Sequence, residues 1–301
     1  MKKHAKSLIK HFSQSLGYEL TVNRVAKEKA DTKPIVFVHI PKCGGISVDR
    51  ALREQLARPG EKRLRRKPII ATSLHNFNRD ISTLDDKCDF SEFHCQQIQS
   101  ILTYHLNLNW HYVSGHINVT KRILDAYSEQ YNFVTLLRDP VDRLISNYIF
   151  NKLTNKFAIM PPSIATKPMT KEELWREADQ LLNSRRGWHM ANTMTMFLTG
   201  RYPKDEQDAK NMQNEVLDNL SKFSVVGQLT KMQSFEQDLS QLIGKPIHIG
   251  RHNTTKAIED NNALFVRESL NEYFAQESVK DNIKILCNNE TIIISKLPKF
   301  D

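Results

Sequence analysis

The chain has 301 residues, of which 40% are hydrophobic, 8% aromatic and 26% charged. These proportions are typical of a globular protein and exclude a low-complexity or intrinsically disordered chain. Lys and Arg number 43 against 34 Asp and Glu, giving a formal net charge of +9. This charge favours an anionic partner, whether nucleic acid, anionic lipid, acidic polysaccharide or a phosphate-bearing cofactor. No run of about 18 apolar residues occurs, so we expect no transmembrane segment.

The cysteines and the first residues indicate a reducing compartment. Four cysteines do not form a disulfide framework in a chain of this length, and none has the spacing of a zinc site. The first thirty residues are basic but lack the apolar block of a secretory signal. We therefore expect a cytoplasmic protein without a metal site. Residues 1–33 are predicted to form a basic N-terminal extension, whose contact with a membrane surface stays open.

The first strong structural signal is the segment IVFVHI at residues 35–40. A continuous run of β-branched and aromatic residues predicts a strand buried on both faces, as in a parallel sheet. The letters PKCGG follow as a loop, and residues 46–56 have the spacing of a helix. The unit is therefore a strand, a glycine-containing loop and a helix.

The next segment carries the densest positive run of the chain. We expect residues 57–90 to be irregular, and the basic run at 62–67 to be either a solvated loop or a surface that meets an acidic substrate. A helix at 92–106, a short strand at 111–115 and a helix at 121–128 are predicted to follow.

A second strand and helix begin at residue 133. Residues 133–137 read as a buried strand, after which Asp139 is placed to cap a helix that has Pro140 in its first turn. Arg138 ends the strand, and Ser146 lies about 9 Å along the helix from its start.

The rest of the chain continues the alternation. Residues 151–170 are predicted to be a proline-punctuated and mobile loop, 171–198 mostly helical, 223–229 a third buried strand and 235–244 a helix that ends in glycine. The tail after residue 256 reads as largely helical. No Pro/Gly/Ser-rich linker divides the chain, so we expect residues 34–301 to form a single domain.

Both strand-to-helix junctions suit an anion. Backbone N–H groups and the positive end of a helix dipole face an anion held in such a loop. Lys42 precedes Gly44 and Gly45, whereas the lysine of a nucleotide-triphosphate loop follows its glycines, so this is not a Walker A motif. Arg138 and Ser146 could contact a second anionic group together.

An ion pair is the alternative to anion binding for Arg138. The neighbouring Asp139 and Asp142 could each pair with its guanidinium, which would leave Ser146 as an ordinary residue of the helix surface.

Together the two junctions, IPKCGGIS and LRDPVDRLIS, resemble those of sulfotransferases that use 3′-phosphoadenosine-5′-phosphosulfate (PAPS). The resemblance is to the carbohydrate branch, which includes heparan-sulfate and chondroitin sulfotransferases and their bacterial relatives. SGHIN near residue 116, NTMTMFLTG at 192–200 and VVGQL at 225–229 follow in the family order. The resemblance implies an α/β, P-loop-like three-layer fold, with a central parallel sheet of about four or five strands flanked by helices.

The resemblance also implies roles for individual residues. Arg138 and Ser146 match the pair that holds the 3′-phosphate of PAPS. The family loop reads KTGGTS, and Cys43 and Ile46 stand at its two threonine positions, so two hydroxyl contacts are lost while the backbone donors remain. The residues expected around the 5′-phosphate and the sulfuryl group are Lys42, Cys43, Gly44, Gly45, Ile46 and Ser47.

A hydroxyl acceptor must lose a proton, and histidine is the commonest base near neutral pH. We expect His116 to be this base because it follows a short strand and because related carbohydrate sulfotransferases place a catalytic histidine in the comparable segment. Lys42 is expected to stabilise the charge on the departing phosphate. His39 reads as a core or loop-supporting residue, and His105 and His111 stay open as alternatives.

The leading interpretation is a sulfotransferase acting on a hydroxyl of a saccharide or glycoconjugate, without a metal and without a nucleic-acid partner. Arg63, Arg65 and Arg66 are candidate contacts to an acidic acceptor. Two alternatives stay open: a nucleotide or small-molecule kinase of similar fold, and a non-catalytic protein that binds acidic glycan or nucleic acid. The sequence carries no signal of an oligomeric state.

Overall fold

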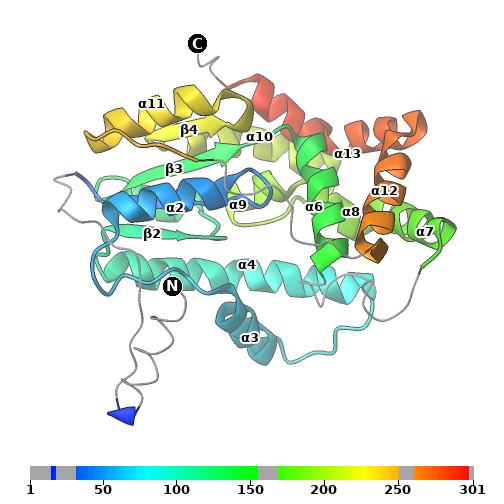
Figure 1. The fold of residues 1–301 in the computed structure, drawn as a ribbon, viewed down its shortest axis with the longest axis horizontal. Coiled ribbons are helices and arrows are strands. Elements are labelled where there is room, and N and C mark those ends of the chain that lie inside the picture. Colours follow the sequence, from blue (N-terminus) through cyan, green and yellow to red (C-terminus); the bar gives the residue numbers. More distant parts are fainter. Residues whose placement is uncertain (1–14, 18–31, 155–168, 251–260, 298–301) are drawn as a thin grey trace.

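Four parallel strands form the centre of the protein (Figure 1). The computed structural model describes residues 15–17, 32–154, 169–250 and 261–297. In these ranges the strand order is β2-β1-β3-β4. All four predicted strands are confirmed; three are slightly shorter than expected, and β3 begins one residue earlier than expected. They are β1 (Ile35–Val38), β2 (Tyr112–Gly115), β3 (Asn132–Leu137) and β4 (Val225–Gln228).

Two helices cover one face of the sheet. Helix α2 (Gly45–Leu56) packs Val48, Leu52 and Leu56 against Ile35 and Phe37 of β1. Helix α11 (Met232–Ile243) covers the same face through Phe235, Leu239 and Ile243. Both are amphipathic helices predicted from their apolar spacing.

Other helices of the described ranges cover the opposite face. Alternate residues of the strands, such as Val36 and Val38, point to this side, because successive side chains of a strand face opposite directions. The three layers confirm the predicted α/β fold with a parallel central sheet. The covering helices are α4 (Leu84–Asn107), α5 (Lys121–Tyr127), α9 (Thr193–Thr199) and α10 (Glu206–Leu220).

A third apolar cluster contains only helices. It gathers at one end of the sheet, on the right in Figure 1. Helix α6 follows β3 directly, so this is the end where the strands finish. The helices are α6 (Pro140–Thr154), α7 (Lys171–Leu182), α8 (Arg185–Ala191), α12 (Asn261–Ala275) and α13 (Glu277–Ser295).

The prediction of an irregular segment at 57–90 is wrong. Helix α3 spans Arg66–Phe77, with Pro68 in its first turn, where a proline has no intrahelical hydrogen bond to lose. Only two of its side chains are buried, so its sequence carries almost no apolar periodicity. Helix α4 starts eight residues before the predicted position of 92, because Thr83 and Asp86 form a reciprocal capping box.

Other boundaries follow the predictions more closely. Residues 171–198 are helical with two short breaks, and Gly200 ends α9 in the left-handed conformation at φ 83°. The predicted loop at 151–170 begins later than expected because α6 continues to Thr154. Residues 155–168 lie outside the described residues, as do 1–14 and 18–31 of the N-terminal extension. Among the described helices, none is both long and apolar enough to cross a membrane.

Candidate active site at the carboxyl edge of the sheet

The loop between β1 and α2 has the backbone of an anion-binding nest. Lys42 and Gly44 both have positive φ, 66° and 79°. Alternating left-handed and right-handed residues turn successive N–H groups toward one point. Gly44 is also the N-cap of α2 and has no side chain to satisfy the first N–H groups of that helix. The loop is therefore built to accept an anion at the start of the helix.

Three side chains of this loop face different surroundings. The Nζ atom of Lys42 lies 3.9 Å from the centre of the Phe150 ring on α6. The Cys43 side chain is buried, and burial raises the pKa of its thiol to about 12. Its Sγ donates to the Pro41 carbonyl oxygen at 3.7 Å. Ile46 is 49% exposed at the first turn of α2, where the resemblance placed it beside the ligand.

Arg138 reaches the loop from the end of β3. Its Nη1 donates to the Lys42 carbonyl oxygen at 3.2 Å, and its Nη2 lies 3.7 Å from Asp142. The structure thus brings Arg138 to the loop while also forming the alternative ion pair. The Asp139 side chain accepts from the Asp142 N–H at 2.9 Å, as the predicted cap requires. Ser146 lies half-buried on α6, two turns beyond Arg138.

His116 stands just beyond the end of β2, with a defined tautomer. Its Nδ1 lies 2.7 Å from the His39 carbonyl oxygen, which can only accept, so Nδ1 carries the proton of the neutral ring. Nε2 then holds the lone pair. Burial lowers the pKa of His116 to about 4, the His39 hydrogen bond opposes this, and the neighbouring Arg66 and Arg63 lower the pKa further. The ring is therefore neutral at pH 7, with the lone pair on Nε2.

The alternative histidines lie at the other edge of the sheet. His111 directly precedes β2 and His116 directly follows it, so about 16 Å of strand separates them. His105 lies in the last turn of α4, with its ring 4.6 Å from that of Trp110. Only His116 among these three shares an edge with Lys42 and Arg138.

A buried carboxylate near His116, that of Asp49, was not predicted from the sequence. Asp49 of α2 accepts hydrogen bonds from Tyr112 at 3.0 Å and from Ser114, and it pairs with Arg63 at 2.5 Å. Arg53 lies 3.7 Å from the same carboxylate and donates to Ser114 at 2.8 Å. Its spacing on α2 marks Asp49 as an inward residue, and an inward acidic residue was the signal that could have found it.

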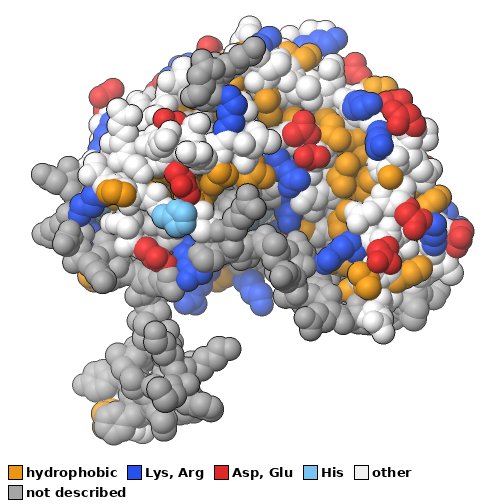
Figure 2. All heavy atoms as spheres, turned by 45° about the horizontal axis from the view of Figure 1, so that its top comes forward, with side chains coloured by type: hydrophobic (Ala, Val, Ile, Leu, Met, Phe, Trp, Pro, Cys, Tyr) orange, Lys and Arg blue, Asp and Glu red, His pale blue; other side chains and the backbone are white. Residues whose placement is uncertain are grey.

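The basic run at 62–67 begins beside this carboxylate. Arg63 is half exposed, yet its guanidinium is held by the buried Asp49. Arg66 starts α3 and, with Arg63, lies near enough to His116 to lower its pKa. Arg65 is exposed. On the face that Figure 2 shows, basic and acidic side chains are interspersed, so the net charge does not collect into one broad basic surface there.

A buried ion pair anchors the helices behind the loop. Arg143 and Glu290 are both fully buried, with Nη2 and Oε2 3.5 Å apart. Arg143 also donates to the Met190 carbonyl oxygen at 2.6 Å, and Glu290 accepts from the Thr195 N–H at 2.9 Å. Because the pair connects α6, α8, α9 and α13, it fixes the helix that carries Ser146 and Phe150.

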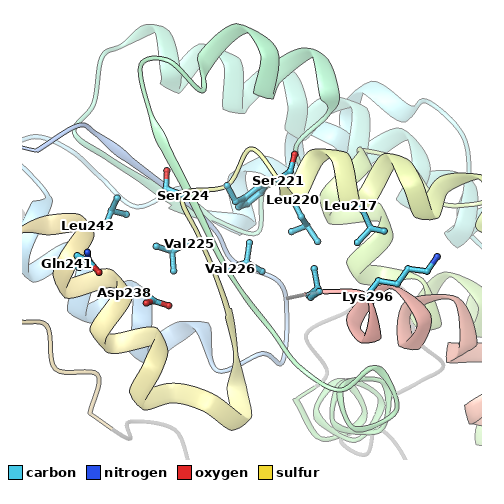
Figure 3. Close-up of a pocket in the computed structure, with 12 residues that line it drawn as sticks. Leu217, Leu220, Ser221, Ser224, Val225, Val226, Asp238, Gln241, Leu242 and Lys296 are labelled. Atoms are coloured by element: carbon cyan, nitrogen blue, oxygen red, sulfur yellow. The ribbon is translucent and has the colours of Figure 1, made fainter. Parts of the chain in front are cut away.

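The amino edge of the sheet contains a cavity of a different character. It has a volume of about 640 Å³ and lies over the start of β4, between the ends of α10 and α13 and one side of α11 (Figure 3). Its lining is mostly apolar, with Leu220, Val226 and Leu242 on three sides. No sequence-predicted site residue lines it. In the parts of the chain that the structure describes, no group of three or more His, Cys, Asp or Glu residues could hold a metal ion.

Comparison with known proteins agrees with the geometry. The family model described as the sulfotransferase family matches residues 29–286, which span both strand-to-helix junctions and His116. No curated protein matches the chain. A match over most of the chain, with the nest, Arg138 and His116 at one edge of the sheet, establishes that the chain belongs to the sulfotransferase family and is a transferase of sulfuryl groups.

Proposed function

We propose that the protein transfers a sulfuryl group from PAPS to a hydroxyl of a saccharide or glycoconjugate, with His116 as the general base. The observation that carries the proposal is the fixed tautomer of His116. A neutral imidazole with its lone pair on Nε2 stands at the same edge as a loop built for an anion. Family membership favours sulfuryl transfer over the kinase alternative.

The donor side of the site fits a doubly phosphorylated nucleotide. The nest formed at Lys42 and Gly44 and the start of α2 suit the 5′-phosphosulfate. Arg138 lies against the same loop and would hold the 3′-phosphate with Ser146, because a planar guanidinium matches phosphate oxygens. PAPS supplies the sulfuryl group in an activated form. Lys42 would then stabilise negative charge on the departing phosphate.

The fit also accommodates the two departures from the family loop. Cys43 points into the core and is 1% exposed, so its replacement of a threonine leaves the backbone donors of the loop in place. Ile46 is exposed at the head of α2 and contributes its N–H without a hydroxyl. We expect donor binding to rest on backbone N–H groups, Lys42 and Arg138.

On the acceptor side, His116 takes the hydroxyl proton at Nε2. Its Nδ1–H stays hydrogen-bonded to the His39 carbonyl, so the ring keeps its orientation when the second nitrogen is protonated. The acceptor proposal is a saccharide because the site resembles the carbohydrate branch. Arg63, held by Asp49, and Arg66 lie beside His116 and would favour an acceptor with acidic groups.

The test is calorimetric titration of 3′,5′-adenosine bisphosphate into the wild-type protein and two variants. Arg138→Ala removes a charge-assisted contact and should weaken binding about 10- to 150-fold. Arg50→Ala is the matched control, because Arg50 also forms an i,i+4 pair, with Glu54 at 3.2 Å, but lies on the exposed side of α2. ATP with Mg²⁺ should bind at least about tenfold more weakly than the bisphosphate. No binding of the bisphosphate to the wild type would refute the donor assignment.

A further inference from the structure

His39 lies next to both His116 and the loop between β1 and α2. We call this loop, with Gly45 at the start of α2, the donor loop, because it is proposed to hold PAPS. His39 directly follows β1, and its N–H donates to the Gly115 carbonyl oxygen at 3.1 Å. Its own carbonyl oxygen accepts from His116, as described above. The backbone of this one residue thus ties β1 to the segment that carries the base.

The side chain of His39 packs against both the His116 ring and Gly45. It is 6% exposed, with its ring centre 4.5 Å from that of His116 and 5.5 Å from that of Phe37. It also lies against Gly45, so closely that a Cβ added to Gly45 would overlap the imidazole. This contact explains why a glycine that lacks a positive φ begins α2.

The two histidines are unequal in access to solvent. His39 is buried and His116 is half-buried. Burial lowers the pKa of His39 well below its ordinary value, and His116 and Arg63 lower it further. Burial and the neighbouring positive charges therefore both disfavour a protonated His39 ring.

We propose that the His39 side chain is a positioning residue for the transfer reaction, a wedge that sets the separation between the donor loop at Gly45 and the imidazole of His116. The proposal rests on the proposed function of His116 as the base. Its physical content is that the ring acts by shape and by excluding water from His116, and that its nitrogens take no part in proton transfer. The charged groups near His116 are Asp49 of α2, Arg63 of the preceding loop and Arg66 of α3, and none of them is altered in the test.

Two substitutions separate shape from chemistry. His39→Ala removes the ring, and His39→Phe keeps a planar ring without nitrogens. We expect His39→Ala to lower kcat about 10²-fold, as misplacement by about 1 Å does, with a smaller change in KM for PAPS. His39→Phe should recover at least about tenfold of that loss, because it restores the wedge. His111→Ala, at the other edge of the sheet, is the control.

A second readout does not depend on activity. The Cε1–H resonance of His116, assigned by its loss in His116→Ala, reports the protonation of that ring. In the wild type we expect the ring to stay neutral down to about pH 5. In His39→Ala its titration should move up toward that of an exposed histidine, whereas in His39→Phe it should stay low.

Several results would contradict the proposal that His39 is a positioning residue. His39→Phe being as inactive as His39→Ala, with 3′,5′-adenosine bisphosphate still bound, would mean that the nitrogens of His39 act in the chemistry. An unchanged kcat and an unchanged His116 titration in His39→Ala would remove the role altogether. Loss of cooperative thermal unfolding in both variants would make His39 a folding residue. If the wild type transfers no sulfuryl group, the proposed function fails, and the His116 titration still decides whether His39 shields that ring.

Discussion

The amino and carboxyl edges of the sheet each place a histidine near acidic and basic side chains, but only the carboxyl edge has the geometry of a binding site. At the carboxyl edge His116 lies near Asp49, Arg63 and Arg66. At the amino edge His111 lies near Glu61 and Arg58. In both places burial lowers the pKa of the histidine and an acidic side chain opposes the shift. Residue types alone therefore do not distinguish the site from its counterpart.

The backbone makes the difference between the edges. Glu61 accepts hydrogen bonds from the main-chain N–H groups of Arg58, His111 and Tyr112. Both of its carboxylate oxygens therefore hold the loop to the start of β2. Asp49 instead accepts from the side chains of Tyr112, Ser114 and Arg63, which leaves a cation exposed beside His116. The carboxyl edge also has the loop of Lys42 and Gly44, which we propose binds an anion. A binding site needs hydrogen-bond donors that are available to a ligand. At the amino edge the N–H groups of Arg58, His111 and Tyr112 donate to Glu61 instead.

The first prediction, for which we expect the greatest loss of turnover, compares His116 with His111. His116→Ala should lower turnover about 10²–10⁴-fold because the proposed general base is lost, while binding of 3′,5′-adenosine bisphosphate persists. His111→Ala should change turnover by less than about threefold, since it lies at the far edge. Steady-state rates with thermal unfolding curves check both. Equal losses of turnover in folded His116→Ala and His111→Ala would contradict a special role for the carboxyl edge.

The second prediction compares two glycines. Gly45→Ala places a Cβ against the His39 ring and should weaken bisphosphate binding at least about tenfold, because the loop must shift. Gly60 of the amino edge has φ 89° and open space around it, so Gly60→Ala should cost only about 1–2 kcal/mol of stability and leave binding unchanged. Calorimetry and denaturant titration separate these outcomes. Unchanged affinity in Gly45→Ala would show that the loop tolerates displacement.

The third prediction compares the two carboxylates. Glu61→Gln places an amide where an oxygen accepts N–H groups and should lower the free energy of unfolding by about 1–3 kcal/mol, with unchanged turnover per folded molecule. Asp49→Asn should lower stability by a similar amount and also lower turnover, because Arg63 loses its partner beside His116. Urea unfolding and steady-state rates on the same samples test this. A Glu61→Gln enzyme with impaired turnover would argue that the amino edge takes part in function.

The last prediction concerns pH, to which we expect kcat/KM to respond only weakly. Because burial lowers the pKa of His116 to about 4, the neutral base is present above that value and is lost only as the pH falls through it. Between pH 7 and 5.5 kcat/KM should therefore change less than about twofold, whereas a base with the ordinary pKa of about 6.5 would lose about 90% of its activity. A profile of kcat/KM against pH distinguishes the two. An acid limb near pH 6.5 would mean that His116 is open to water.

Most of the architecture follows from local patterns. The runs IVFVHI and NFVTLL are continuous and β-branched, so they predicted buried parallel strands, and the glycines and Asp139 marked where each helix begins. Helix α3 was missed because it buries only Ser73 and Phe77 and therefore lacks an apolar stripe. The start of α4 was missed although its capping box at Thr83 and Asp86 is readable in the sequence.

The residue pattern alone was enough to predict the loop of Lys42 and Gly44, the arginine at the end of β3 and their meeting at the carboxyl edge, because parallel strands bring their ends to the same side. Contacts in the folded chain were needed to establish the tautomer of His116, the ion pair between Asp49 and Arg63, and the packing of His39 against both Gly45 and His116. These depend on contacts between residues distant in the chain, such as the 77 positions that separate His39 from His116. Local conformational preference fixes strands and loops, but it carries no information about which distant side chains will share a buried space.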